Sequence, residues 1–249
     1  MSSLHYPNPI EKQVCDNYHR VIENIERTTR NSGRPTQSVK LVVVTKKQPI
    51  NLIDAVIKAG AIYLGENYAD EAQPKIYTFR SNTKISWHMI GHMQSRKAEI
   101  ISDHFDYIHS LDSLKLAERF NRILKEKGKK LPFLLQFNVS GEETKSGWNA
   151  SQEQLWDHLL PEIEKIVHLE NVEVRGIMTM PPYSDNSEDA RPYFRKLVKL
   201  RDYLGIKFPG VSWDEVSMGM SGDYEVAIQE GATWIRIGQA ILGSRPCNA

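Results

Sequence analysis

Residues 41–49 read Leu-Val-Val-Val-Thr-Lys-Lys-Gln-Pro, and the rest of the predicted fold can be built outward from this stretch. Its β-branched and apolar residues are typical of a buried parallel strand. Pro49 then begins a helical pattern over residues 50–59, because proline is well suited to the first turn of a helix. The stretch therefore predicts a buried strand that passes directly into a helix, which is the repeating unit of α/β folds.

The two lysines that end this strand face in different directions. Alternate side chains of a strand share a face, so Lys46 lies with Val42 and Val44, whereas Lys47 lies with Thr45 on the outward face. An amine at the carboxyl end of a buried strand is partly desolvated, which lowers its pKa and makes it a better nucleophile toward carbonyl groups. Lys46 is therefore a candidate nucleophile. The alternative is that both lysines only end the strand and reach solvent.

Short apolar strands alternate with helical patterns along most of the chain. The predicted strands cover residues 41–45, 62–64, 85–90, 107–109, 133–139, 172–178, 213–218 and 233–237. The predicted helices cover residues 10–30, 50–59, 68–78, 95–101, 113–127, 151–167, 188–204 and 221–230. Four glycines are predicted to end helices, namely Gly60, Gly128, Gly205 and Gly231. This alternation indicates strands joined by right-handed parallel crossovers.

Eight such strands in 249 residues favour a closed (β/α)8 TIM barrel over an open doubly wound sheet. The additional amino-terminal helix would pack outside the barrel or cover its floor. No linker, low-complexity tract or repeat indicates a second domain, so we expect one domain over residues 1–249, with an amino-terminal helix and lead-in over residues 1–38. The expected active site is the carboxyl end of the strands. Seven segments lie there: residues 46–49, 65–70, 91–97, 139–147, 178–187, 218–223 and 238–240.

The composition argues against several classes of protein. A formal net charge of +1 gives no electrostatic case for binding nucleic acid or an anionic membrane. The apolar runs are far shorter than the roughly 20 residues that span a bilayer, and residues 1–11 do not resemble a signal peptide. Cys15 and Cys247 lie near opposite ends of the chain, and His88 and His92 lack companion ligands. We therefore expect a cytoplasmic protein without a metal.

Glycine-rich loops follow the last two predicted strands. Residues 217–223 follow strand seven and residues 236–240 follow strand eight. Barrel enzymes often bind phosphate at these two loops, because glycines let backbone N–H groups approach an anion closely. Ser221 could add its hydroxyl, although the glycines could serve only tight turns and Ser221 only a helix cap. This position in the barrel favours a phosphate site.

Arg236 shares a face of strand eight with Trp234, and strand eight neighbours strand one in a closed barrel. Arg236 and Lys46 are therefore expected near each other at the barrel mouth. An inward arginine needs a partner, so a bound ring or anion is expected. These parts admit two interpretations: an aldolase-like enzyme whose lysine forms a Schiff base with a phosphorylated sugar, or a protein that binds pyridoxal phosphate.

An ordered series of motifs at the strand ends separates these interpretations. The motifs cover residues 43–46, 65–68, 87–91 with Gln94 and Lys97, 145–147, 176–179, 217–221 and 235–238. Over residues 10–246 the chain resembles the pyridoxal phosphate homeostasis protein family, whose fold is similar to the barrel domain of alanine racemase. The chain departs from the family pattern at Thr45, where serine is usual, and at Arg96, where asparagine is common.

The resemblance implies a cofactor, pyridoxal 5'-phosphate (PLP), and a set of residues that bind it. The implied residues are Lys46 for the Schiff base, Asn67 beside the ring substituents, Ser221, Gly238 and Gln239 for the phosphate, Arg236 at the pyridine nitrogen, and His88, Met178 and Met218 along the pocket wall. No catalytic or metal-binding residue is implied. The roles of Arg96, Lys145 and the acidic segment 184–189 stay open.

The resemblance implies a protein that holds PLP and takes part in intracellular PLP homeostasis, without substantial catalytic activity. An arginine at the pyridine nitrogen disfavours its protonation and so weakens the cofactor as an electron sink. Alanine racemase also takes a second base from another domain, for which we expect no room before Ala249. PLP-requiring apoenzymes or free amino acids are the expected acceptors, and a monomer is expected. The alternative is a PLP-dependent amino acid racemase or lyase.

Overall fold

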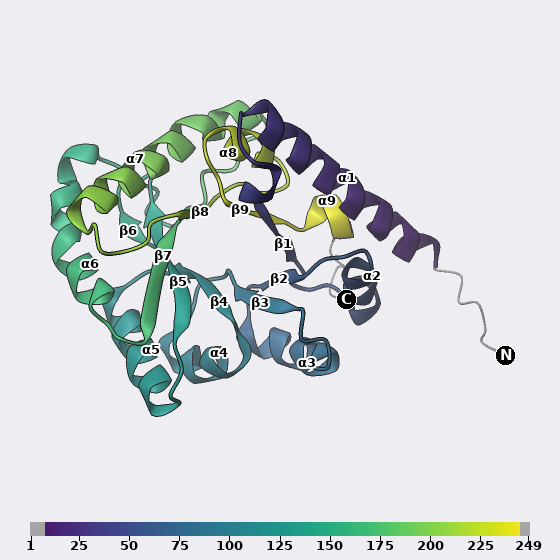
Figure 1. The fold of residues 1–249 in the computed structure, drawn as a ribbon, viewed down its shortest axis with the longest axis horizontal. Helices are drawn as coiled ribbons and strands as arrows, with labels where there is room; N and C mark the ends of the chain where they lie inside the picture. Colours follow the sequence, from purple (N-terminus) through teal and green to yellow (C-terminus); the bar gives the residue numbers. More distant parts are fainter. Residues whose placement is uncertain (1–7, 245–249) are drawn as a thin grey trace.

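The computed structural model describes residues 8–244, and its centre is a closed barrel of parallel strands surrounded by helices (Figure 1). The barrel strands are β1 (Lys40–Val44), β2 (Tyr63–Glu66), β3 (Ser86–Met89), β4 (Tyr107–Leu111), β5 (Leu131–Asn138), β7 (Val172–Met178), β8 (Glu215–Ser217) and β9 (Trp234–Ile237). They pair in the order β4-β3-β2-β1-β9-β8-β7-β5, and β4 pairs with β5 to close the barrel. The predicted (β/α)8 barrel is confirmed. A short strand that the sequence did not indicate, β6 (Trp148–Asn149), pairs with β5.

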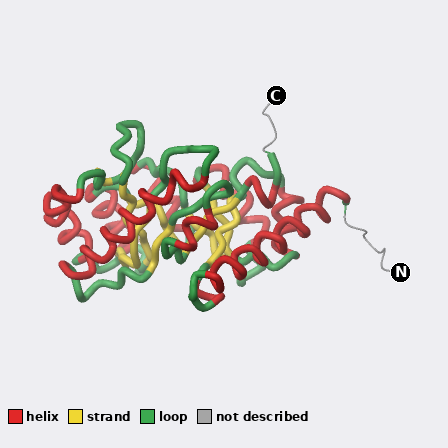
Figure 2. The backbone as a smooth tube through the Cα atoms, turned by 90° about the horizontal axis from the view of Figure 1, so that it is seen from above, coloured by secondary structure: helices red, strands yellow, loops and turns green. Residues whose placement is uncertain are grey.

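Helices cover the outside of the barrel and enclose the strands (Figure 2). They are α1 (Pro9–Asn31), α2 (Ile50–Lys58), α3 (Ala69–Phe79), α4 (Ala98–His104), α5 (Leu114–Glu126), α6 (Leu160–Val167), α7 (Arg191–Lys207), α8 (Tyr224–Gln229) and α9 (Gln239–Leu242). Four 3-10 turns are η1 (Thr36–Ser38), η2 (Ser95–Lys97), η3 (Glu153–Leu159) and η4 (Ser187–Ala190). The predicted helix end at Gly205 is wrong, because α7 continues to Lys207. Gly60, Gly128 and Gly231 do follow helix ends, with positive φ angles.

Helix α1 lies outside the barrel beside α9, α8 and α2, not across the floor (Figure 1). Its first turn is capped by the Asn8 side chain, which accepts from the Ile10 N–H. Residues at helical spacing, such as Val14 and Val21, are buried on the face toward the barrel. The Asn17 amide donates to the Ile241 carbonyl at 3.2 Å. These contacts hold α1 against the crossovers that flank β1 and β9.

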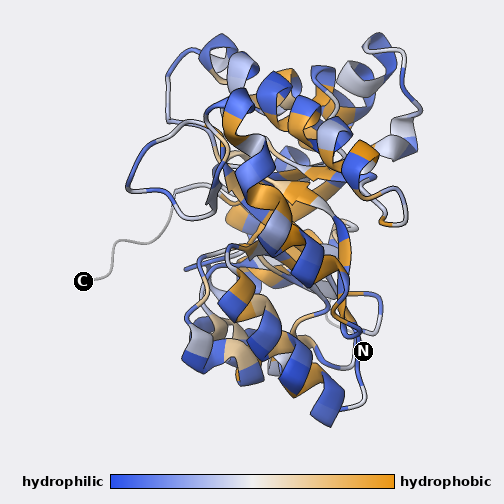
Figure 3. Cartoon of the chain, turned by 90° about the vertical axis from the view of Figure 1, so that its left-hand side faces the viewer, coloured by the Kyte–Doolittle hydropathy of each residue, from blue (hydrophilic) through white to orange (hydrophobic). Residues whose placement is uncertain are grey.

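The strands divide the core into two apolar clusters. Along β1, Leu41 and Val43 belong to the large cluster between the barrel and its helices, whereas Val42 and Val44 belong to a small cluster inside the barrel. The predicted alternation of faces in this strand is therefore confirmed. In Figure 3 the apolar residues face the interior, and hydrophilic residues cover the outer helix surfaces.

A carboxylate fills the amino-terminal end of the barrel. Glu215 accepts hydrogen bonds from the Lys40 ammonium at 2.9 Å, from the Trp234 indole at 2.7 Å and from the Tyr107 hydroxyl. Burial, followed by the charge of Glu215, raises the pKa of Tyr107 above its usual range, so this hydroxyl stays a donor.

Three further observations concern membrane-spanning helices, metal ligands and the cysteines. Across residues 8–244, no helix has the length and apolar character needed to cross a membrane. The same residues contain no group of three or more histidine, cysteine, aspartate or glutamate side chains suited to a metal ion. Cys15 is a free thiol, and Cys247 lies outside the described residues.

Candidate functional site

A cavity of about 510 Å³ opens at the carboxyl ends of the barrel strands. Its walls come from the ends of β1, β2 and β3, the loop after β7, and the loops after β8 and β9. Six of the residues implied by the resemblance line it, namely Lys46, Asn67, Ser221, Arg236, Gly238 and Gln239. The structure therefore brings together side chains that are almost 200 positions apart in sequence.

Strand geometry explains why Lys46, and not Lys47, reaches this cavity. Val44 and Lys46 both line the cavity, in keeping with their shared face of β1. Lys47 is exposed and is not among the lining residues. In the pairing of β1 with β9, Arg236 lies opposite Val42, four residues before Lys46. The guanidinium therefore lies deeper in the barrel than the amine.

The loops after β8 and β9 meet at the predicted phosphate position. The Ala240 N–H in the first turn of α9 donates to Ser221 Oγ at 3.4 Å, which ties the two loops together. A Cβ atom added at Gly238 would lie 3.1 Å from the carbonyl oxygen of Val44. Glycine at this position therefore lets the start of α9 lie close to β1.

Arg236 is almost fully buried at the cavity floor. Its guanidinium donates to Ser217 Oγ at 2.5 Å and to the Thr179 carbonyl at 3.0 Å. Burial lowers the pKa of Arg236 to about 10, an effect that the negative charge of Asp223 partly offsets. The side chain is still a cation at neutral pH, and it gives the floor of the cavity a positive charge.

A chain of hydrogen bonds runs from Arg236 through the barrel interior. Arginine can only donate, so Ser217 Oγ accepts from it, which leaves the hydroxyl hydrogen available to donate to His109 Nδ1 at 2.9 Å. His109 then carries its proton on Nε2 and donates to His88 Nδ1 at 2.8 Å. His88 in turn donates from Nε2 to Ser86 Oγ at 3.1 Å. In this arrangement each histidine carries its proton on Nε2 and accepts at Nδ1.

Both histidines in this chain are neutral. Burial, followed by the positive charge of Lys40, lowers the pKa of His88 to about 3. Burial also holds the pKa of His109 well below its usual range, with additional lowering by His88 and Arg236. A neutral imidazole has one donor and one acceptor, which is what each position in the chain requires.

Three of the implied residues do not line the cavity. His88 is buried in the hydrogen-bond chain and stacks on Tyr107. Met178 is fully buried in the cluster inside the barrel. Met218 is fully buried in the outer cluster, on the same side of the chain as Val216, because alternation directs these residues toward the helices. The motif resemblance did not distinguish residues that line the cavity from residues that are buried in the core around it.

Other lining residues were not predicted from the sequence to bind the cofactor. They are Val44, Ile90, Met180, Pro182, Tyr183, Ser184, Met220, Gly222 and Asp223. Most lie in the segments that the barrel rule selected, but no local pattern indicated which side chains turn inward. Asp223 illustrates this point, because its Oδ1 accepts from the Met220 N–H at 2.6 Å and shapes the loop from within. Burial raises the pKa of Asp223 above its usual range.

The ends of β2 and β3 meet closely at Asn67. A Cβ atom added at Gly91 would lie 2.4 Å from the Asn67 carbonyl oxygen, so only glycine allows this approach. Arg96 lies beyond it, donating from Nε to Gln94 at 2.9 Å, and lines a neighbouring cavity of about 430 Å³ that also includes Asn67. Lys145 forms an ion pair with Glu142 in the loop after β5.

The acidic segment forms a hydrogen-bonded turn before α7. Ser184 Oγ donates to Asp189 at 2.7 Å, and the Asn186 side chain caps η4 by accepting from the Glu188 N–H. Ser184 is the one member of this turn that also lines the cavity.

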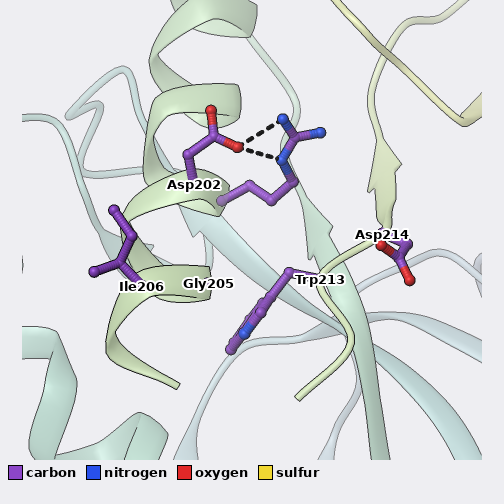
Figure 4. A pocket seen from close by; sticks show the side chains of 6 residues that line it. Asp202, Gly205, Ile206, Trp213 and Asp214 are labelled. Atoms are coloured by element: carbon purple, nitrogen blue, oxygen red, sulfur yellow. Dashed lines mark hydrogen bonds and ion pairs between the residues drawn. The ribbon is translucent and has the colours of Figure 1, made fainter. Parts of the chain in front are cut away.

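A second hollow, of about 480 Å³, lies at the opposite end of β8 (Figure 4). Trp213 and Asp214 line it from the segment before the strand, and Gly205 and Ile206 line it from α7. The ion pair drawn there joins Arg201 to its sequence neighbour Asp202. None of the residues implied by the resemblance reaches this hollow.

Comparison with known proteins connects this site to a family. The sequence profile described as "Alanine racemase, N-terminal domain" matches residues 17–246. The pyridoxal phosphate homeostasis protein of Vibrio alginolyticus is 36% identical over 235 residues, which cover 93% of this chain and 97% of that protein. The protein of the same name from Aquifex aeolicus is 38% identical, covering 93% and 98%. The chain belongs to the pyridoxal phosphate homeostasis protein family. The predicted family resemblance is therefore confirmed.

Solved structures agree with this assignment. PipY of Synechococcus elongatus PCC7942, solved with PLP bound, has a TM-score of 0.78 and 31% identity, covering 92% of this chain and all of that chain. An alanine racemase of Clostridium difficile 630 has a TM-score of 0.66 at 18% identity, and the match covers 94% of this chain and 58% of the racemase chain. The second likeness shows a shared barrel fold between the pyridoxal phosphate homeostasis protein family and part of alanine racemase.

Proposed function

We propose that this protein binds PLP in the cavity at the strand ends and takes part in PLP homeostasis within the cell. The observation that carries the proposal is a single cavity that combines the Lys46 amine, the buried Arg236 cation and the paired loops around Ser221 and Gly238. PLP has an aldehyde, an aromatic ring with a pyridine nitrogen, and a phosphate, which match these three features. The bound PLP of the related PipY structure supports the same assignment.

The residues of the cavity suit the parts of the cofactor. Lys46 would supply its neutral amine to the aldehyde carbon, and the aldehyde oxygen would leave as water to give a Schiff base. Ser221, Gly238 and Gln239 would hold the phosphate, and Asn67 would lie beside the ring substituents. Arg236 would face the pyridine nitrogen, and it would keep that nitrogen unprotonated because two positive charges would otherwise meet.

This arrangement favours a carrier over an amino acid racemase or lyase. A pyridine ring kept unprotonated by Arg236 would be a weak electron sink. Racemisation also needs a second proton-transfer group on the opposite face of the bound substrate. Tyr63 lies in the barrel interior against Trp234, and Tyr68 and Tyr183 are 53% and 90% exposed. In the described part of the chain, none of these tyrosines has a buried hydrogen-bond partner that would orient its hydroxyl for proton transfer.

We propose that this site transfers its bound PLP to other molecules. Tyr183 and Met180 are exposed at the mouth, which would let another amine reach the cofactor. PLP-requiring apoenzymes and free amino acids are the acceptors that we propose, for a cytoplasmic protein that acts as a monomer.

The direct test is reduction of the PLP-loaded protein with borohydride, followed by peptide mass mapping. The expected result is a visible absorption band before reduction and a pyridoxyl group on Lys46 afterwards. A label mainly on Lys47 would overturn the assignment, because that side chain is exposed and lies outside the cavity.

Two substitutions test the phosphate position. Ser221→Ala should weaken PLP retention by about 1 kcal/mol, since one hydroxyl shares the phosphate with backbone donors. Gly238→Val should weaken it more, because the added side chain would occupy the approach to the backbone and crowd Val44. Equilibrium dialysis measures both, with Gly210→Val as a control at an open position away from the cavity. Wild-type retention in both cavity variants would place the phosphate elsewhere.

The carrier role predicts that the PLP-loaded protein does not racemise alanine appreciably. The physical reason is that Arg236 would weaken the cofactor as an electron sink, and that the exposed tyrosines Tyr68 and Tyr183 have no buried partner within residues 8–244 to hold them as a second base. Incubation with L-alanine followed by chiral chromatography measures the reaction. Turnover at about 1 s⁻¹ or faster, the low end for ordinary enzymes, would establish the racemase alternative instead.

A further inference from the structure

The turn that follows β1 has an unusual backbone. Within residues 8–244, Lys47 is the one non-glycine residue with a positive φ, at 58°. This conformation is unfavourable for a residue with a side chain, and it persists where its surroundings hold it. The turn also carries Lys46, so whatever holds Lys47 also acts on the residue that reaches the cavity.

The two peptide groups on either side of Lys46 are both held by side chains from α3. Lys75 Nζ donates to the Thr45 carbonyl, in the peptide group before Lys46, at 2.9 Å. The Lys47 N–H, in the peptide group after Lys46, donates to Glu71 Oε1. Peptide groups are rigid planes. Holding both planes restrains φ and ψ of Lys46, and therefore the direction in which its Cα–Cβ bond leaves the backbone.

Lys75 is central to this arrangement. Its ammonium has three hydrogens, and they meet three oxygens: the Thr45 carbonyl at 2.9 Å, Glu66 Oε1 at 2.8 Å and Glu71 Oε1 at 2.7 Å. Glu71 and Lys75 are one turn apart on α3, so they face the same way. We call Glu66, Glu71 and Lys75 the Lys75 network.

Two of the three members of the network are buried, which restricts their geometry. Lys75 is 6% exposed and Glu66 is fully buried. Burial raises the pKa of Glu66, while the charge of Lys75 lowers it in part. Glu66 Oε1 also accepts from Thr45 Oγ1 at 2.6 Å, so the carboxylate holds both the ammonium and the strand end. Thr45 faces outward as predicted, but it is fully buried and serves as part of this support.

We propose that the Lys75 network is the positioning device for Lys46, which sets the direction of the amine into the cavity. This inference rests on the proposed bond between Lys46 and the aldehyde of PLP. No member of the network lines the cavity, so none is placed to contact the cofactor itself. Glu66 and Glu71 are therefore positioning residues, and their chemistry acts through the backbone of the turn.

Two ligands separate positioning of Lys46 from general stabilisation. PLP has the aldehyde, whereas pyridoxine 5'-phosphate has a hydroxymethyl group in its place and reports ring and phosphate contacts alone. Glu71→Ala removes the acceptor of the Lys47 N–H, and Glu71 is only partly buried, so the fold is expected to survive. The variant should bind PLP about tenfold more weakly, because one charge-assisted hydrogen bond is lost, and pyridoxine 5'-phosphate within about twofold of wild type.

Matched variants complete the test. Glu71→Gln keeps an oxygen acceptor and should restore most of the PLP affinity. Asp54→Ala removes another ion pair of the same spacing, Asp54–Lys58 on α2, and should leave both ligands unaffected. Lys75→Gln shortens the side chain and removes its charge. It should also weaken the binding of PLP more than the binding of pyridoxine 5'-phosphate, and it is the second variant if Glu71→Ala does not fold.

Each outcome decides between the hypotheses. Equal weakening of both ligands, or unchanged PLP affinity in Glu71→Ala, would overturn the positioning role while leaving the proposed function intact. If wild-type protein binds pyridoxine 5'-phosphate, but the PLP-loaded protein gives no reduced adduct on Lys46, the proposed bond to Lys46 fails, and the positioning role fails with it.

Discussion

Lys46→Ala is expected to abolish the visible absorption band of the PLP-loaded protein and all borohydride-stable labelling of the chain. The amine is the group that would bond to the aldehyde, and no other lysine lines the cavity among residues 8–244. The variant should stay folded, because the core inside the barrel consists of residues such as Val42 and Trp234 and does not depend on the amine. Absorption spectroscopy and intact-protein mass measure the loss.

Lys47→Ala is the matched control. It changes the next residue in the same turn, but its side chain is exposed and outside the cavity. The variant keeps the backbone N–H of residue 47, which donates a hydrogen bond to Glu71. The band and the label should therefore survive. A Lys46→Ala protein that still gives the band would show that another amine carries the cofactor.

Acid is expected to destabilise the protein strongly through the two histidines in the barrel. Burial lowers the pKa of His88 to about 3 and holds that of His109 well below 6.5. The unfolded state therefore binds more protons than the native state below pH 6.5, so the free energy of unfolding falls as the pH falls from about 6.5 toward 3. His88 contributes roughly 1.4 kcal/mol per pH unit over this range, or about 3 kcal/mol at about pH 4.5, and His109 adds to the loss in the same direction.

Urea unfolding at neutral pH and at about pH 4.5 measures this effect. The double variant His88→Gln/His109→Gln should be less stable at neutral pH but should lose much less stability on acidification. Burial raises the pKa values of Glu66, Asp106 and Asp223, which acts in the opposite direction, but both proteins keep these groups. His19→Asn, at an exposed position, is the control. Equal pH slopes in wild type and double variant would refute this account.

The hydrogen-bond chain gives a structural reason for that sensitivity. His109 must accept at Nδ1 from Ser217 and donate at Nε2 to His88. Protonating His109 would turn its acceptor into a second donor facing Ser217, whose oxygen already accepts from Arg236. Acid would therefore disturb the floor of the cavity as well as the core. This coupling was not visible in the sequence, where His88 resembled a residue of the pocket wall.

The sequence by itself determined the barrel and the direction of Lys46. Both follow from local rules: apolar strands alternating with helices predict parallel crossovers, and a period of two along residues 41–47 assigns each side chain to a face. The placement of the two glycine-containing loops beside β1 also followed, because closing the barrel makes the last strand the neighbour of the first. These features depend on neighbours along the chain and on a general rule of topology.

Only the tertiary structure decided which side chains reach the cavity and what holds them. Met218 lies behind the barrel wall, and His88 lies beneath the cavity in contact with His109 from the next strand. Lys75 looked like an ordinary charged residue of a helix, yet it is buried against the backbone of Thr45, 30 positions earlier. Such contacts join residues on different strands and helices, and they depend on side-chain direction and burial, neither of which a one-dimensional pattern specifies.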